Sequence, residues 1–270
     1  ARLDLAERRN TLRADTAVVS VMYANNETGV VFPIEEIGQI VKAHGAAFHV
    51  DAVQAVGKLP LDMAQSTIDL LSLSGHKLHA PKGVGVLYIR KGIRLVPLII
   101  GGHQERNRRG GTENVASIVG LGRACELARA ALGEENDRVR RFRDKLEDGI
   151  LRSVPNVRVN GDREHRLPNT TSISFEYIEG EAILLLLDQL GICASSGSAC
   201  TSGSLEPSHV LRAMGVPFTA SHGSIRFSLS RYNTEAEIDY VLEHLPPLIE
   251  RLRNISPFWK DYQEQLARQF

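Results

Sequence analysis

A lysine that follows an apolar strand is the residue with the clearest potential for chemistry. Lys77 ends the segment Ser72-Leu-Ser-Gly-His-Lys77, and Pro81-Lys-Gly-Val-Gly85 follows shortly after it. A free lysine amine is protonated near neutral pH, so a Schiff-base lysine needs burial or neighbouring charge to lower its pKa. A turn of small residues at the end of a strand is a suitable place for such a lysine.

An aspartate at the end of an earlier apolar strand is the natural counterpart of Lys77. The segment Phe48-His-Val-Asp51-Ala-Val-Gln54 reads as a strand whose C-terminal end carries Asp51. Where pyridoxal phosphate acts as an electron sink, an acid of this kind keeps the ring nitrogen protonated. Asp51 and Lys77 together predict a pyridoxal 5'-phosphate site with a Schiff base on Lys77.

Other interpretations of these residues stay open at this point. Lysines are mostly solvated, and an aspartate after a strand is often a turn former or a helix cap. His49 and Asp51, with a distant histidine such as His76 or His79, have the spacing of a facial iron triad. The triad leaves Lys77 and its turn without a function, so the sequence favours the Schiff base and no metal.

The three cysteines have different surroundings. Cys125 lies among apolar residues and Cys193 follows Leu190-Gly-Ile, so both are expected in the core, Cys193 at a strand edge. Cys200 lies between Ser198-Ala199 and Thr201-Ser202-Gly203, where no apolar face could pack and the backbone is free to move. This composition favours a nucleophile or carrier. The cysteines form neither a disulfide framework nor a zinc spacing, which indicates a reducing cytoplasmic setting.

An arginine inside an apolar strand is a further candidate. Arg226 lies in Ser224-Ile-Arg-Phe-Ser-Leu, where an unpaired guanidinium is costly. A carboxylate is therefore its expected partner, from the protein or from a substrate.

Six separated segments share one resemblance. They are Asn25-Asn-Glu-Thr-Gly29, Asp51-Ala-Val-Gln54, Ser72-Leu-Ser-Gly-His-Lys77, Gly101-Gly-His-Gln-Glu-Arg106, Gly111-Thr-Glu-Asn114 and Ser195-Ser-Gly-Ser-Ala-Cys-Thr-Ser-Gly203. Together they resemble the cysteine desulfurase family of fold-type-I pyridoxal phosphate enzymes, most closely its NifS-like, nitrogen-fixation branch. The resemblance implies an α/β fold: part of the large domain of such a transferase, with a mainly parallel sheet and flanking helices, then a smaller α+β domain.

The resemblance also implies roles for individual residues. Lys77 and Cys200 are the implied catalytic residues, Lys77 as Cα proton acceptor and Cys200 as the persulfide-forming thiol. The implied cofactor-binding residues are Asn26, Asp51, Gln54, Ser74, His76, Lys77 and Thr112. Gln54 would meet the phenolic oxygen, Ser74 and His76 the phosphate, and Thr112 the phosphate of a neighbouring subunit. Asn26 and Arg226 would bind the substrate carboxylate.

The charge and hydropathy of the chain indicate which classes of partner are unfavourable. The chain has 270 residues, with 32 Lys and Arg against 32 Asp and Glu, so no global field favours nucleic acid or an anionic membrane. No apolar run approaches the roughly 20 residues of a membrane helix. A soluble cytoplasmic protein is expected, and the arginines of residues 138–143 are expected on a solvated helix face.

The order of elements predicts two domains. Strands are expected at residues 17–22, 46–50, 68–73 and 83–89, with a helix between Pro33 and Gly45. Two helices are expected at 115–132 and 134–153, followed by strands at 157–159, 171–175 and 225–230, a helix at 181–190, and a helix opened by a capping box at 234–237. We therefore expect a cofactor-binding domain at 1–131 and a domain with the cysteine loop at 132–270.

The expected function is removal of sulfur from L-cysteine, which gives L-alanine and a persulfide on Cys200. An iron–sulfur scaffold protein, as in nitrogenase maturation, would take the sulfur, and the enzyme would be a homodimer. A selenocysteine lyase, an aminotransferase of the same fold and a catalytically incomplete fragment are the alternatives. Compared with the family pattern, the N-terminal segment with a phosphate-binding turn and a ring-stacking histidine is missing, so the chain alone is expected to bind the cofactor weakly.

Overall fold

The structure is a computed structural model that describes residues 3–197 and 207–268. The chain divides into two compact units. The N-terminal unit consists of Arg2–Ala24 and Val31–Leu132, and the C-terminal unit is built mainly from Asn25–Val30 and Gly133–Phe270. The sequence predicts one boundary, between residues 131 and 132. It does not predict that Asn25–Val30 belongs to the C-terminal unit.

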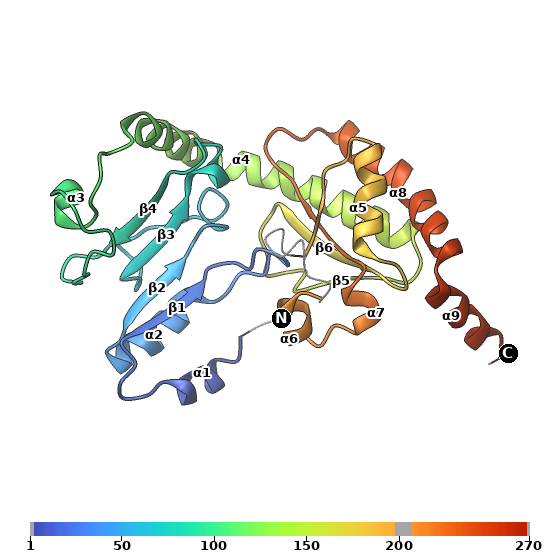
Figure 1. Cartoon of the computed structure of the whole chain (residues 1–270), viewed down its shortest axis with the longest axis horizontal. Helices are drawn as coiled ribbons and strands as arrows, with labels where there is room; N and C mark the ends of the chain where they lie inside the picture. Colours follow the sequence, from blue (N-terminus) through green and yellow to red (C-terminus); the bar gives the residue numbers. More distant parts are fainter. Residues whose placement is uncertain (1–2, 198–206, 269–270) are drawn as a thin grey trace. The chain divides into compact units, whose positions relative to one another are not determined.

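A four-stranded sheet forms the centre of the N-terminal unit (Figure 1). Its strands, in spatial order, are β1 (Val18–Met22), β2 (Ala47–Asp51), β3 (Leu70–Ser74) and β4 (Gly85–Ile89). The first three are mutually parallel, and β4 is antiparallel to β3. All four strands lie where the sequence predicts them, and the expected mainly parallel sheet is confirmed.

Helix α2 (Ile34–His44) covers this sheet because one of its faces is apolar. Ile34, Ile37 and Val41 are buried and share a core cluster with Phe48 and Val50 of β2. Gly45 ends the helix with a φ of 87°, in the left-handed region that glycine adopts without steric cost. Pro33 is the N-cap rather than the first helical residue, a shift of one position from the expectation.

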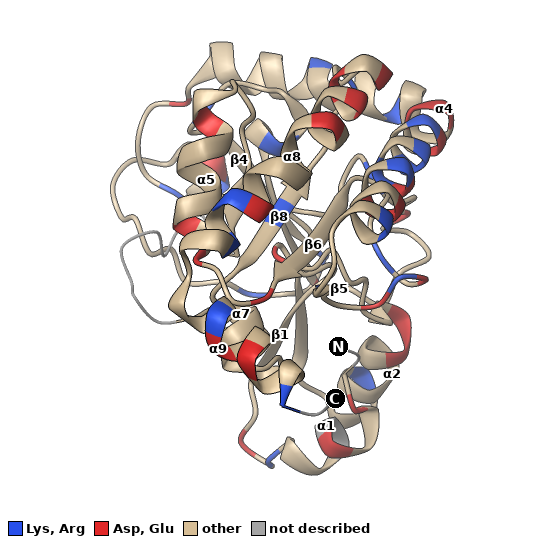
Figure 2. Cartoon of the chain, turned by 90° about the vertical axis from the view of Figure 1, so that its right-hand side faces the viewer, with Lys and Arg blue, Asp and Glu red and all other residues tan. Residues whose placement is uncertain are grey.

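The expectation of two helices at 115–132 and 134–153 is wrong: α4 (Val115–Ser153) is one continuous helix. Gly133 lies between the expected helices, but a glycine weakens a helix interior by only about 1 kcal/mol relative to alanine and does not end it. Both basic and acidic residues are distributed along α4 (Figure 2). The division between the two units falls within this helix, between Leu132 and Gly133.

The C-terminal unit has an antiparallel sheet, as expected for an α+β domain. Its strands are β5 (Val157–Val159), β6 (Thr170–Phe175), β8 (Ser224–Ser228) and β7 (Ser195–Ser196), in that spatial order. Ile173, Phe175 and Ile225 are almost fully buried, and α5 (Gly180–Gln189) adds Ile183 and Leu187 to the same core.

The remaining elements connect or extend these layers. They are α1 (Leu5–Thr11), the 3₁₀ turn η1 (Gly75–Leu78), α3 (Gln104–Asn107), α6 (His209–Ala213), α7 (Phe218–Ser221), α8 (Glu235–Ile255) and α9 (Pro257–Ala267). The predicted capping box at the start of α8 is confirmed, since Thr234 and Glu237 each bond the backbone of the other. None of the helices in residues 3–197 and 207–268 combines the length and apolar composition that crossing a membrane requires.

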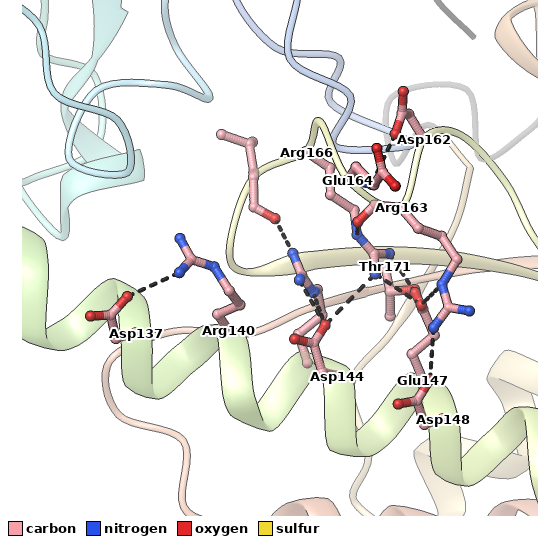
Figure 3. Close-up of polar contacts among 12 residues, drawn as sticks. Asp137, Arg140, Asp144, Glu147, Asp148, Asp162, Arg163, Glu164, Arg166 and Thr171 are labelled. Carbon is pink, nitrogen blue, oxygen red and sulfur yellow. Dashed lines mark hydrogen bonds and ion pairs between the residues drawn. The ribbon is translucent and has the colours of Figure 1, made fainter.

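A buried charge network ties α4 to the loop before β6 (Figure 3). Glu147 is fully buried and receives hydrogen bonds from both terminal nitrogens of Arg166 and from the Thr171 hydroxyl, the latter at 2.5 Å. Arg163 Nε lies 2.8 Å from Glu147 Oε1. Arg166 also forms a β-bridge with Val30. The network therefore supports the Asn25–Val30 segment within the C-terminal unit.

The same network corrects the expectation for the arginines at 138–143. Arg143 is only 4% exposed, and its Nη1 donates to the Leu167 carbonyl at 2.6 Å. Arg138 donates to the Asn233 and Arg231 carbonyls. These two side chains satisfy backbone acceptors in the C-terminal unit, so they do not belong to a purely solvated face.

Candidate active site

Two adjacent parallel strands bring the predicted cofactor residues of the N-terminal unit to one edge of its sheet. Asp51 is the last residue of β2 and is opposite Ser72 of β3, which ends at Ser74. Turn η1 then carries His76 and Lys77. Because parallel strands end at the same edge, Asp51, Ser74, His76 and Lys77 lie on one side of the sheet, the usual place for ligands in α/β proteins.

Short local contacts orient the acid. Asp51 is half-buried, and its Oδ1 accepts the Val53 N–H at 3.0 Å. Gln54 follows in a turn in which the Ala55 and Val56 N–H groups donate to the Ala52 carbonyl. The second carboxylate oxygen of Asp51 is not used by that bond, so an acid at this position can meet a ring nitrogen.

His49 has a supporting role that the sequence did not reveal. Its Nδ1 lies 2.7 Å from Ser20 Oγ and its Nε2 lies 2.7 Å from Ser72 Oγ, so the ring bridges β1 and β3. Both ring nitrogens are engaged, which leaves none for iron. Within residues 3–197 and 207–268, no group of three His, Cys, Asp or Glu side chains could hold a metal ion. The facial-triad interpretation therefore has no support in the geometry.

Gly75 fixes the position of the lysine turn. A β-carbon at Gly75 would lie 2.8 Å from Val84 Cγ1 and 2.9 Å from the Val84 carbonyl oxygen, so only glycine fits. The Gly75 N–H donates to that carbonyl at 2.8 Å. Ser74 Oγ and His76 Nδ1 lie 2.7 Å apart, and the His76 and Lys77 side chains are exposed.

This donor set fits pyridoxal phosphate. It offers an amine for the aldehyde, a carboxylate for the ring nitrogen, and a hydroxyl and an imidazole for the phosphate, all from one sheet edge. The residues of the described N-terminal unit thus match the chemistry that the cofactor requires.

A second group of predicted residues lies in the C-terminal unit. Arg226 of β8 donates from Nη1 to the Asn26 backbone carbonyl at 2.9 Å. The structure therefore brings Asn26 and Arg226 together, through the backbone of Asn26. The expected carboxylate partner of Arg226 stays a prediction.

The turn that carries Asn26 also contains a residue that sequence reasoning missed. Glu27 is 1% exposed, and its Oε2 accepts a hydrogen bond from Ser208 Oγ at 2.5 Å. A usable signal was present: Glu27 is a charged residue within a motif of the resemblance, directly beside a predicted binding residue, and it had no assigned role.

The remaining predicted residues have separate positions. Thr112 is exposed in a loop after Gly111, whose φ is 108°. Cys200 lies outside the described residues. Cys125 is partly buried against Leu121 and Ala124, and burial raises the pKa of its thiol. Cys193 is exposed, so its expected place in a strand-edge core is wrong; the turn after α5 turns the side chain outward.

The comparisons with known proteins agree on one family. The Aminotransferase class-V family matches residues 1–241. A cysteine desulfurase of Nostoc sp. is 64% identical in an alignment 269 residues long, which covers 97% of this chain and 67% of that protein. This chain belongs to the cysteine desulfurase family.

Further relatives support the NifS-like branch. The cysteine desulfurase NifS of Azotobacter vinelandii is 64% identical over 258 residues, 96% of this chain and 64% of that protein. A solved structure described as a NifS-like protein aligns with a TM-score of 0.85 at 41% identity, over 93% of this chain and 66% of that one. The chain thus spans about two thirds of the length of these relatives. The predicted family and fold class are confirmed, and cysteine desulfurases of this family use pyridoxal phosphate.

Proposed function

We propose that this protein is a pyridoxal phosphate-dependent cysteine desulfurase that removes sulfur from L-cysteine. The observation that carries the proposal is the placement of Asp51 and Lys77 at the ends of adjacent parallel strands, with Ser74 and His76 beside them. The family membership agrees with this chemistry.

The chain's own residues divide the work. When bound, the cofactor supplies an electron sink for the substrate's Cα carbanion. Lys77 holds the cofactor covalently until substrate arrives and then takes the Cα proton, because its exposed amine stands at the same sheet edge as Asp51. Asp51 holds a proton at the ring nitrogen, and the Val53 N–H keeps its carboxylate oriented.

Substrate orientation falls to Arg226 and Asn26. The Arg226 guanidinium donates from Nη1 to the Asn26 carbonyl, which places it beside the turn that carries Asn26. A bidentate bond from the guanidinium would hold the α-carboxylate of L-cysteine, as the family resemblance implies, with the Asn26 amide assisting.

Sulfur transfer is assigned to Cys200 on the basis of its sequence setting and the family. Its thiolate attacks the sulfur of the substrate, the substrate Cβ–S bond breaks and an S–S bond forms. The electron pair of the broken bond stays with the carbon skeleton, whose β-carbon takes a proton to give L-alanine. The net change converts L-cysteine and a Cys200 thiol into L-alanine and a Cys200 persulfide, with sulfur oxidised and carbon reduced.

We also propose that the enzyme works as a homodimer. Residues 95–100 expose apolar side chains that a monomer rarely leaves in water, with Val96, Leu98 and Ile100 each at least 87% exposed. The Gly110 N–H donates to the Ile99 carbonyl, so this apolar segment adjoins the turn that carries Thr112. If a second copy covered this segment, Thr112 of one subunit would lie near the cofactor site of the other. This agrees with the implied role of Thr112 toward the phosphate bound by a neighbouring subunit.

The sulfur acceptor is proposed to be an iron–sulfur scaffold protein of the nitrogenase-maturation type, in the cytoplasm. The similarity to NifS and the free thiols of Cys125 and Cys193 support this setting.

The proposal is tested by turnover assays on the purified protein with pyridoxal phosphate. We expect L-cysteine to give alanine, and sulfide when a thiol reductant is present. Cys200→Ser should still change the cofactor absorbance on addition of L-cysteine but release no sulfide. Amino transfer that depends on a keto acid would instead favour an aminotransferase, and turnover of selenocysteine alone would favour a selenocysteine lyase.

A further inference from the structure

Glu27 is a buried carboxylate to which the proposed reaction gives no task. A carboxylate that is 1% exposed loses its water and must find compensating partners. Ser208 Oγ donates to Glu27 Oε2 at 2.5 Å and so supplies one such partner. Both residues belong to the C-terminal unit.

The turn that carries Glu27 is held in a single conformation. Asn25 Oδ1 accepts the backbone N–H groups of Glu27 and Thr28, each at 2.9 Å. Gly29 has a φ of 74°, and a β-carbon there would lie 3.1 Å from Thr170 Cβ. The Asn25 side chain and Gly29 therefore shape the backbone of the turn that carries Glu27.

Glu27 touches both flanks of the segment that contains Cys200. On the preceding side, a β-carbon at Gly197 would lie 3.1 Å from Glu27 Oε2 and 3.3 Å from Ser208 Cβ. On the following side, Ser208 is the N-cap of α6, and its Oγ accepts from the Val210 and Leu211 N–H groups. The same carboxylate oxygen thus lies against residue 197 and residue 208.

The flanks are also connected to the substrate-binding arginine. Strand β7 leads into Gly197 and pairs with β8, where Ser195 is opposite Arg226. Arg226 in turn bonds the carbonyl of Asn26, the neighbour of Glu27. One turn therefore contacts the arginine and both flanks of residues 198–206.

We propose that Glu27 is a positioning residue for sulfur transfer: its carboxylate ties together the two flanks of the segment that carries Cys200. This inference rests on the proposed function, because the sulfur-accepting role belongs to Cys200. Contact between the two flanks sets where the segment begins and ends, and the orientation of reacting groups raises the rate at which they react. The Glu27 carboxylate does not touch substrate in this scheme and acts through Gly197 and Ser208.

The test compares Glu27→Ala and Glu27→Gln in the full-length protein. Removal of this buried hydrogen bond should lower the rate of alanine formation about tenfold or more in Glu27→Ala. The KM for L-cysteine and the change in cofactor absorbance should stay close to those of the parent. Glu27→Gln should recover part of the rate, since its amide oxygen still accepts from Ser208. Ser208→Ala should resemble Glu27→Ala, whereas Ser208→Thr keeps the hydroxyl and the helix cap and should resemble the parent.

Hydrogen exchange gives a readout that does not depend on activity. Glu27→Ala should speed exchange at residues 195–197 and 208–211 and leave that of β6 unchanged. Leu248→Ala, a core truncation on α8, is the control for general destabilisation. The proposal is overturned if both Glu27→Ala and Ser208→Ala turn over L-cysteine at the parent rate, or if exchange rises throughout the unit as in Leu248→Ala. A parent protein that forms no alanine contradicts the proposed function, while the exchange data still decide whether Glu27 ties the flanks.

Discussion

At the residue scale, the candidate reactive side chains are positioned by neighbouring residues that take no part in the proposed reaction. Lys77 has its position because Gly75 allows the backbone to pass against the Val84 carbonyl. Asp51 has its orientation because the Val53 N–H reaches back to it. The sequence indicated these candidate groups, whereas contacts such as these follow only from the fold.

Lys77→Ala should remove covalent attachment of the cofactor and all turnover, since no other predicted site residue carries an amine. The measurement is borohydride reduction of the protein loaded with pyridoxal phosphate, followed by intact-mass analysis. Lys82→Ala changes an exposed lysine nearby and is the matched control, which should keep the adduct. A reduced adduct in Lys77→Ala at the parent level would place the attachment elsewhere.

The sequence predicted the positions of Asp51, Lys77 and Ser74 at or just after strand ends, because strand ends are marked by the change from apolar to polar residues. It missed Glu27 and Glu147, whose partners lie far away in the sequence: Ser208 for the first, and Arg163, Arg166 and Thr171 for the second. A sequence pattern does not show which long-range partner will compensate a buried charge.

At the scale of elements, the strands were predictable and the extent of α4 was not. Short apolar runs bounded by polar turns usually form strands. All strands but the two-residue β7 therefore lie close to their expected positions. A glycine between two helical patterns does not show whether the helix ends there. The low helix propensity of one glycine costs little free energy compared with the hydrogen bonds of a continuous helix.

Gly133→Ala should therefore stabilise the protein by up to about 1 kcal/mol, the difference in helix propensity between the two residues. A β-carbon at Gly133 meets no atom within 4 Å. On the same helix, a β-carbon at Gly149 would lie 2.5 Å from Leu242 Cδ2, so Gly149→Ala should destabilise. Urea unfolding of the two variants checks the opposite signs, and a lower stability for Gly133→Ala would argue against a continuous α4.

The network around Glu147 joins α4 to β6 and should make the C-terminal unit less stable in acid. Burial by itself would raise the pKa of Glu147, but hydrogen bonds from Arg166 and Thr171 and the charges of Arg166 and Arg163 lower it below the ordinary value of 4.5. A depressed folded-state pKa stabilises the fold above the unfolded-state value, and this contribution is lost as the pH falls through the folded-state value.

Glu147→Gln should cost about 3–5 kcal/mol at neutral pH, because it leaves Arg166 buried without its counter-charge. Urea unfolding is measured between about pH 3 and pH 7, a range that spans the titration of a carboxylate. The difference in unfolding free energy between parent and variant should shrink below pH 4.5, the ordinary pKa of Glu147. Asp148→Asn changes a carboxylate that is 47% exposed, and should cost about 1 kcal/mol or less. A constant difference across this range would contradict the sign of the pKa shift.

At the scale of the whole molecule, the apolar residues 95–100 point to self-association. Leu98 is 94% exposed, and Leu98→Asp should shift a dimer towards monomer by placing a charge in the proposed contact. Sedimentation velocity over a range of protein concentrations measures this shift. Asp15→Asn, an exposed change in the same unit, should leave the association unaltered; a Leu98→Asp protein that stays fully dimeric would exclude residues 95–100 from the interface.

The central claim is that sulfur leaves L-cysteine and arrives on Cys200. The most direct measurement is mass spectrometry of the Cys200 peptide after one round of reaction with pyridoxal phosphate and L-cysteine and alkylation without reductant, with alanine quantified in the same sample. The account predicts that this peptide gains the mass of one sulfur atom, in a one-to-one ratio with alanine, while the peptides of Cys125 and Cys193 do not. Alanine formation with the added sulfur on another cysteine, or with no added sulfur in a single turnover, would contradict it.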